Sequence, residues 1–225
     1  MVGILAGFSF SQVPEKGPPP PPAPKRITGD SNYPLAKASD LPGEIVGNVY
    51  QNKYFRLRIV PPEAWLAQSP AVNEAIKAKG TELVSGKTKA ADKALDESVQ
   101  RTTILYTVTK DILGIQNNGS LSVVVERIPP LVQIRNGHDF LRLTLQNQKV
   151  LTLPADMRFS ESILSENFGT ETLYYLDIER SVYSQRLYVI ARNGYAISFL
   201  ITYFTKEDLE TMKEILRQSD FAWKE

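Results

Sequence analysis

The chain has 225 residues, with 26 Lys and Arg against 25 Asp and Glu, so it carries no net field that would attract nucleic acid. It contains no cysteine and a single histidine, His138, which excludes disulfide frameworks, thiolate nucleophiles, thiolate zinc sites and multi-histidine metal clusters. We therefore expect no nucleic-acid partner, and carboxylates are the remaining candidate metal ligands.

Residues 1–11 look like part of a signal peptide. The run Val2–Phe10 is apolar, and Ser9 and Ser11 fit the minus-three and minus-one positions of a cleavage site. A basic leading region is missing, and the run is far shorter than the ~20 residues that span a bilayer. We expect an exported protein, periplasmic or extracellular, whose true start lies upstream and which has no membrane span. The alternative is an apolar N-terminus on a cytosolic protein.

Residues 12–47 form a proline-rich segment that we interpret as a disordered tether. Pro18–Pro24, broken only by Ala23, favours an extended polyproline II rod and prevents sheet or helix. The run that ends at Lys25 and Arg26 also fits the P-x-x-P-x-R pattern that SH3-type grooves bind, although such patterns arise easily in proline-rich linkers. The folded domain is expected at 48–225.

The first part of that domain predicts one strand and two helices. Phe55, Leu57 and Ile59 alternate with arginines, as in a half-buried strand. Ser69-Pro70 is a helix start, and Gly80 could end that helix. With the charged stretch that follows, residues 69–101 read as a poorly buried helical insertion, whose narrow apolar stripe must dock on the sheet or on another molecule.

The middle of the domain predicts a hairpin and a helix. Strands at 103–115 and 121–128 flank Asn118-Gly119, a step that suits a type I′ turn. After Pro129-Pro130, an apolar stripe predicts a helix that begins at 136–139 and is broken by Pro154.

The C-terminal part predicts strands around 174–178 and 187–191, and then a turn at Asn193-Gly194. The next run, Tyr195–Phe204, is apolar on both faces, so it belongs in the middle of a sheet covered by helices front and back. Thr205 and Asp208 approximate a capping box for the closing helix. The expected fold class is α+β.

Short stretches at both ends of this domain are similar to PsbP-like domains. They are Asn52–Leu57 followed by Pro61 and Trp65, the hairpin at 193–195 with Phe199, and the ending Ser219-Asp220-Phe221. The resemblance covers residues 48–222 in layout and implies a twisted antiparallel β-sheet with helices on both faces. It suggests a bacterial secreted member of a fold shared with the photosystem II extrinsic subunit and a Ran-binding nuclear import factor. Members mostly bind proteins.

No functional residue is carried over from this resemblance. The matched aromatic, Gly and Pro positions are best explained by packing and turn chemistry. The charged stretch between Trp65 and Thr103 departs from the pattern, so a partner surface of a relative need not be retained.

Two short motifs invite a functional interpretation. Gly86-Lys87-Thr88 resembles the end of a phosphate-binding loop, but the leading glycine would have to stand at Thr81 and no buried parallel strand precedes it. His138 beside Asp139 could be an acid–base pair, yet adjacent residues at a helix start point apart. A helix cap or surface role explains both better.

Two residue types gather in the C-terminal half. A carboxylate pair for glycoside chemistry or calcium could be drawn from Glu161, Glu166, Glu171, Asp177 and Glu179, although a solvated face is the ordinary explanation. An aromatic platform could be drawn from Tyr174, Tyr175, Tyr183, Tyr188, Tyr195 and Tyr203, but their spacing follows strand alternation and favours a core role.

No residue set therefore predicts a catalytic, cofactor or metal site. The sequence favours a non-catalytic exported protein that binds another protein or is an accessory subunit of an envelope assembly. The alternative is a small-molecule or lipid-binding domain, or a carboxylate-based hydrolase, with a pocket between sheet and helices.

Overall fold

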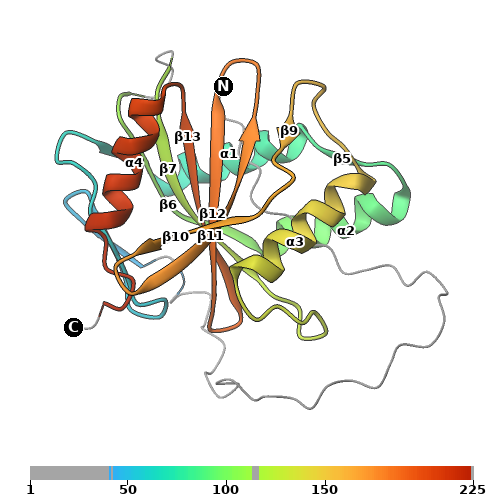
Figure 1. The fold of residues 1–225 in the computed structure, drawn as a ribbon, viewed down its shortest axis with the longest axis horizontal. Coiled ribbons are helices and arrows are strands. Elements are labelled where there is room, and N and C mark those ends of the chain that lie inside the picture. Colours follow the sequence, from blue (N-terminus) through green and yellow to red (C-terminus); the bar gives the residue numbers. More distant parts are fainter. Residues whose placement is uncertain (1–40, 42, 113–116, 224–225) are drawn as a thin grey trace.

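The computed structural model describes residues 41, 43–112 and 117–223. The signal-like segment 1–11 and the proline run lie outside these residues. Within them, eight strands form one antiparallel sheet in the order β10-β11-β12-β13-β7-β6-β4, with β9 beside β11 (Figure 1). These strands are β4 (Leu66–Ala67), β6 (Thr102–Thr109), β7 (Ser120–Arg127), β9 (Arg158–Phe159), β10 (Leu164–Phe168), β11 (Glu171–Glu179), β12 (Ser184–Arg192) and β13 (Tyr195–Tyr203).

Helices lie on both faces of this sheet, as predicted, and the fold class is α+β. Helix α4 covers one face, and α1, α2 and α3 cover the other. Two short strands, β5 and β8, pair with each other on the face that carries α1, α2 and α3. The bounds are α1 (Pro70–Glu82), β5 (Ser85–Gly86), α2 (Lys89–Arg101), α3 (Gly137–Asn147), the 3₁₀ turn η2 (Gln148–Val150), β8 (Leu151–Thr152) and α4 (Lys206–Gln218).

A small three-stranded sheet packs beside α4 on the first face. It consists of β1 (Glu44–Val46), β2 (Val49–Asn52) and β3 (Leu57–Ile59). The chain after α4 returns to β3, where Arg58 and Asp220 exchange two backbone hydrogen bonds of 2.8 Å. Within the described residues the first strand, β1, begins at Glu44, inside the segment 12–47 that the sequence interprets as a tether.

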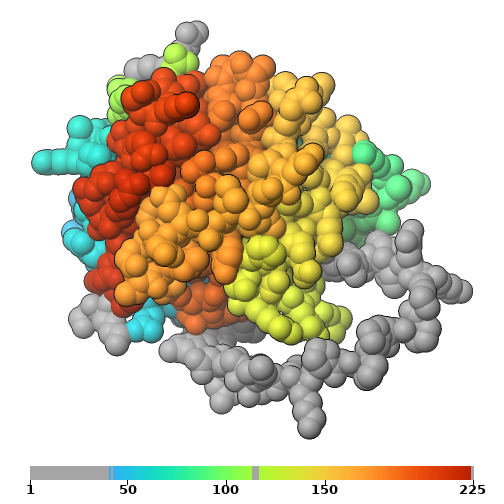
Figure 2. Space-filling model, in the orientation of Figure 1, coloured from blue at the N-terminus to red at the C-terminus, as the bar shows by residue number. Residues whose placement is uncertain are grey.

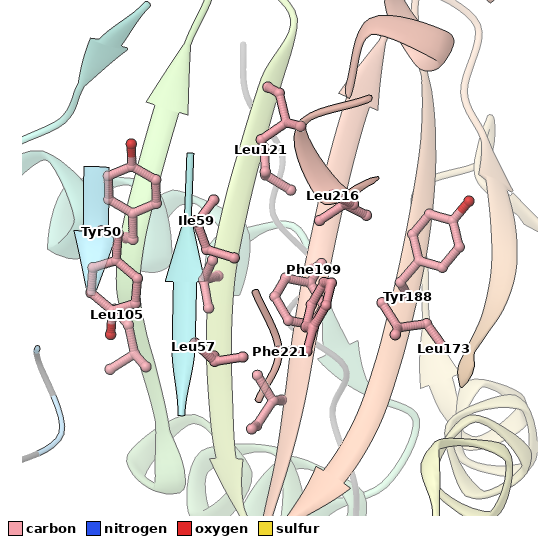
Figure 3. Close-up of a cluster of buried hydrophobic side chains, with 14 of the residues drawn as sticks. Tyr50, Leu57, Ile59, Leu105, Leu121, Leu173, Tyr188, Phe199, Leu216 and Phe221 are labelled. Carbon is pink, nitrogen blue, oxygen red and sulfur yellow. The ribbon is translucent and has the colours of Figure 1, made fainter. Parts of the chain in front are cut away.

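Strand β13 shows why the core has two halves. Its successive side chains point to opposite faces, so Phe199 and Leu200 belong to different apolar clusters. Figure 3 shows the first cluster, in which Phe199 lies with Leu216 of α4 and Phe221. Helix α4 covers one side of this central strand and α1, α2 and α3 cover the other, so both of its faces are buried, as its apolar run predicts.

Local capping signals place the helices. The side chains of Ser69, Asn136 and Thr205 each accept a hydrogen bond from the backbone at the start of α1, α3 and α4. The Thr205–Asp208 capping box is present in full. Gly80 does not end α1, however: it is buried inside the helix, which continues to Glu82.

The predicted β6–β7 hairpin exists, but its turn differs from the prediction. Strand β6 ends at Thr109 and β7 begins at Ser120, whereas the prediction extended the first strand to residue 115; residues 113–116 lie outside the described part of the chain. The Asn118 side chain accepts from the amide of Asp111 (2.9 Å) and donates to its carbonyl (2.7 Å), which closes the base of this loop. The second predicted hairpin is confirmed, with Asn193 and Gly194 at φ 53° and 78° between β12 and β13.

The segment 69–101 docks on the sheet. Ile76 of α1 and Leu95 of α2 are buried in the second cluster together with Ile104 and Val124 of β6 and β7. The helices bury a narrow stripe, as predicted, and the structure places that stripe against the molecule's own sheet.

Candidate functional site

Three chain connections meet at one end of the main sheet. They are the β6–β7 loop, the β11–β12 turn and the junction of β13 with α4. Lys110 of the first forms an ion pair with Asp208 of α4 (3.6 Å), and Tyr183 of the second contacts Phe204 of the junction, with ring centroids 6.1 Å apart. Large apolar side chains are exposed here, with Ile112 at 68% and Val182 at 72%.

A groove of about 620 Å³ opens beside this end, between the first turns of α4 and the strands β12 and β13. Figure 2 shows α4 in red directly beside the orange strands. We call this groove the α4 groove. Its lining residues are Ser184, Arg186, Tyr203, Phe204, Thr205, Lys206, Leu209 and Glu210. The capping box begins α4 two residues after β13 ends, so the start of the helix and the end of the strand both line the groove.

Arg186 lines the sheet side of the groove and is held in an ion pair. Its guanidinium donates to both carboxylate oxygens of Asp177 on β11, at 2.7 and 3.0 Å, and lies 4.2 Å from the ring centroid of Tyr175. Burial alone would lower the pKa of Arg186, but the bonds to Asp177 and Tyr188 raise it above its usual value. Arg186 is therefore a fixed cation held by the sheet.

Glu166 ties β10 to α4 nearby. It accepts a hydrogen bond from the Tyr188 hydroxyl (2.7 Å) and forms an ion pair with Lys213 (2.9 Å). Burial would raise the pKa of Glu166, but the bonds from Tyr188 and Lys213 outweigh it and hold that pKa below its ordinary value. Burial raises the pKa of the Tyr188 hydroxyl, so Tyr188 stays a neutral donor. This contact fixes the position of α4 over the sheet.

The five carboxylates singled out from the sequence lie in different surroundings. Glu166, Glu171 and Asp177 are each paired with a different cation, Lys213, Arg192 and Arg186 respectively. Glu161 and Glu179 are exposed. Within the described ranges, no group of three or more His, Asp or Glu side chains is placed to hold a metal ion.

The predicted tyrosine set divides into core and surface. Tyr188 and Tyr195 are buried, as expected of strand core positions. Tyr203 lines the α4 groove, and Tyr175 lies against Arg186. The sequence interpretation missed Arg186, because its role depends on the β11–β12 register that sets it opposite Asp177.

Neither of the two short motifs lines the α4 groove. Lys87 donates to the carbonyl of Lys149 (2.8 Å), and Gly86 belongs to the two-residue strand β5, paired antiparallel with β8, so the strand before a phosphate loop is missing. His138 is exposed and contacts Tyr174, whereas Asp139 accepts from the backbone of Arg135. Among the residues that the structure covers, no helix is long and apolar enough to cross a membrane.

Comparison with known proteins finds no matching family model and no matching curated protein. Among solved structures, the chain is similar to the solution structure of cyanobacterial PsbP (CyanoP) from Synechocystis sp. PCC 6803. The sequences are 13% identical, the TM-score is 0.40, and the match covers 75% of this chain and 85% of that one.

Proposed function

We propose that this protein is a non-catalytic docking protein, an accessory subunit of an envelope assembly, that binds a segment of a partner protein in the α4 groove. One observation carries the proposal: the groove is open, and its guanidinium and its carboxylate are both ion-paired within the molecule. Such groups are held in place and are not free for proton transfer. The apolar side chains Tyr203, Phe204 and Leu209 remain for contact with a partner.

The shape of the groove favours a protein segment over a small molecule. Small-molecule sites are concave and bury most of their ligand, whereas this groove is open to solvent along α4. The exposed Val182 and Ile112 lie at the same end of the sheet as the groove. An apolar centre with charged groups at its edge is the usual composition of a docking surface.

Truncating the centre of this surface is expected to abolish partner binding. In affinity capture from the native organism, the variant Phe204→Ala with Val182→Ser should lose about tenfold or more of the captured partner, because central apolar anchors carry most of the binding energy. Leu131→Ala is the control, since Leu131 is 96% exposed on the β7–α3 connection. Equal capture by all three proteins would show that the partner binds elsewhere.

We further propose that the protein is exported and that the mature chain begins near Gln12, with the proline segment as a spacer. The support is the Ser9-x-Ser11 junction and the proline run behind it. Cell fractionation followed by N-terminal sequencing should find the protein outside the cytoplasm with residues 1–11 removed. An intact Met1 chain in the cytosol would refute this.

A further inference from the structure

Three charged side chains line the α4 groove: Arg186, Lys206 and Glu210. Arg186 is neutralised by Asp177, and Glu210 is held by Lys213 (3.2 Å) and Arg217 (3.4 Å). Lys206 differs from these groups. It is exposed at the start of α4, and within the described part of the chain no ion pair or side-chain hydrogen bond is formed by its ammonium.

The acidic side chains closest to Lys206 in sequence are engaged elsewhere or point away. Glu210, four residues along and on the same helix face, is the usual partner for such a lysine, but it is bound to Lys213 and Arg217. Asp208 caps the helix by accepting from the Thr205 amide (3.2 Å) and pairs with Lys110. Glu207 is adjacent to Lys206, and neighbouring residues on a helix do not face each other.

We infer that the partner segment carries a carboxylate beside a large apolar side chain, and that Lys206 recognises this carboxylate. The inference rests on the docking function proposed above. Lys206 and Leu209 are three residues apart on one face of α4, so the cation and the apolar wall lie together at the groove. A segment whose apolar side chain packs on Phe204 and Leu209 can therefore place its carboxylate near the ammonium. The other groove charges offer no such complement, because they are already paired.

Complementary charge at an exposed site supplies selectivity more than affinity. A single exposed ion pair changes binding by a small factor, and a like charge at the same place opposes binding. If Lys206 recognises the carboxylate, the protein should bind an acidic peptide more tightly than a matched basic one. This order of affinities should reverse when the charge of residue 206 is reversed.

The test uses the full-length protein and three acetylated, amidated peptides of sequence Gly-Ser-Phe-Leu-X-Ser-Gly, with Asp, Asn or Lys at X. Titration calorimetry at low salt should show the Asp peptide binding about fivefold tighter than the Asn peptide and the Lys peptide weakest. Lys206→Glu should reverse the order, and Lys206→Gln should remove the preference. Added salt should reduce it.

Lys89→Glu is the matched control, because Lys89 is likewise the exposed first residue of a helix, α2, that follows a threonine cap. This variant should keep the Asp preference. Equal binding of the Asp and Asn peptides, with both lost in Phe204→Ala, would overturn the role of Lys206 and leave the docking groove intact. Absence of binding by all three peptides would also overturn this inference, whereas the docking function is judged separately by partner capture.

Discussion

Replacing residues 70–100 with a short Gly/Ser linker is expected to unfold the domain. From the sequence, residues 69–101 read as a poorly buried insertion whose apolar stripe docks either on the sheet or on another molecule. In the structure, Ile76, Val84 and Leu95 are buried against Ile104 and Val124 of the central strands. Each such side chain stabilises the fold by about 1.5–3 kcal/mol, so losing three removes an amount comparable with the whole free energy of unfolding, about 5–15 kcal/mol.

Removing the helices also removes hydrogen-bond partners of polar groups on the sheet. The Ser98 hydroxyl donates to the buried Glu126 carboxylate (2.9 Å), and Lys77 donates to the carbonyl of Thr102 (2.6 Å). Circular dichroism during thermal unfolding should show no cooperative transition in the linker variant. Substitutions of the exposed Glu74 and Lys93 by Ala test the outer surfaces and should change stability by less than about 0.5 kcal/mol. A cooperative transition near that of the parent protein would show that the segment is dispensable.

Gly137→Ala is expected to destabilise the protein by about 3 kcal/mol through a steric clash. Gly137 is the first residue of α3, and a Cβ placed there would lie 2.0 Å from the carbonyl oxygen of Val189 and 2.7 Å from its carbonyl carbon. Both atoms are backbone of β12, an interior strand of the sheet, so the helix has to move instead. That movement would disturb the buried Phe140 and Leu141.

Denaturant titration measures this effect, which should appear as a lower midpoint with an unchanged slope, because the surface exposed on unfolding is the same. The melting temperature should fall by about 6–12 °C, at 2–4 °C per kcal/mol for a chain of this size. His138→Ala is the neighbouring control, since His138 is exposed on the same helix turn. A melting temperature within 1–2 °C of the parent, roughly 0.5 kcal/mol, would show that α3 and β12 can separate at little cost.

The candidate site was only partly visible in the sequence. Glu166, Asp177 and Tyr203 were singled out, but as members of a solvated face or a core, and their partners Arg186 and Lys213 were not. Arg186 meets Asp177 because the β11–β12 turn sets them opposite each other, and Lys213 meets Glu166 because α4 lies beside β10. Neither arrangement has a signature in local spacing.

The sequence by itself determined the local elements of this protein. Cap residues at 69, 136 and 205, the Asn193-Gly194 turn and the doubly apolar run of β13 each depend on residues within a few positions, so their signals are complete in the chain. Only the tertiary structure decided where 69–101 docks, how the β6–β7 loop is closed and which charges at the α4 groove remain without a partner. Those outcomes depend on strand register and layer packing, which join residues far apart in sequence through contacts that no local pattern encodes.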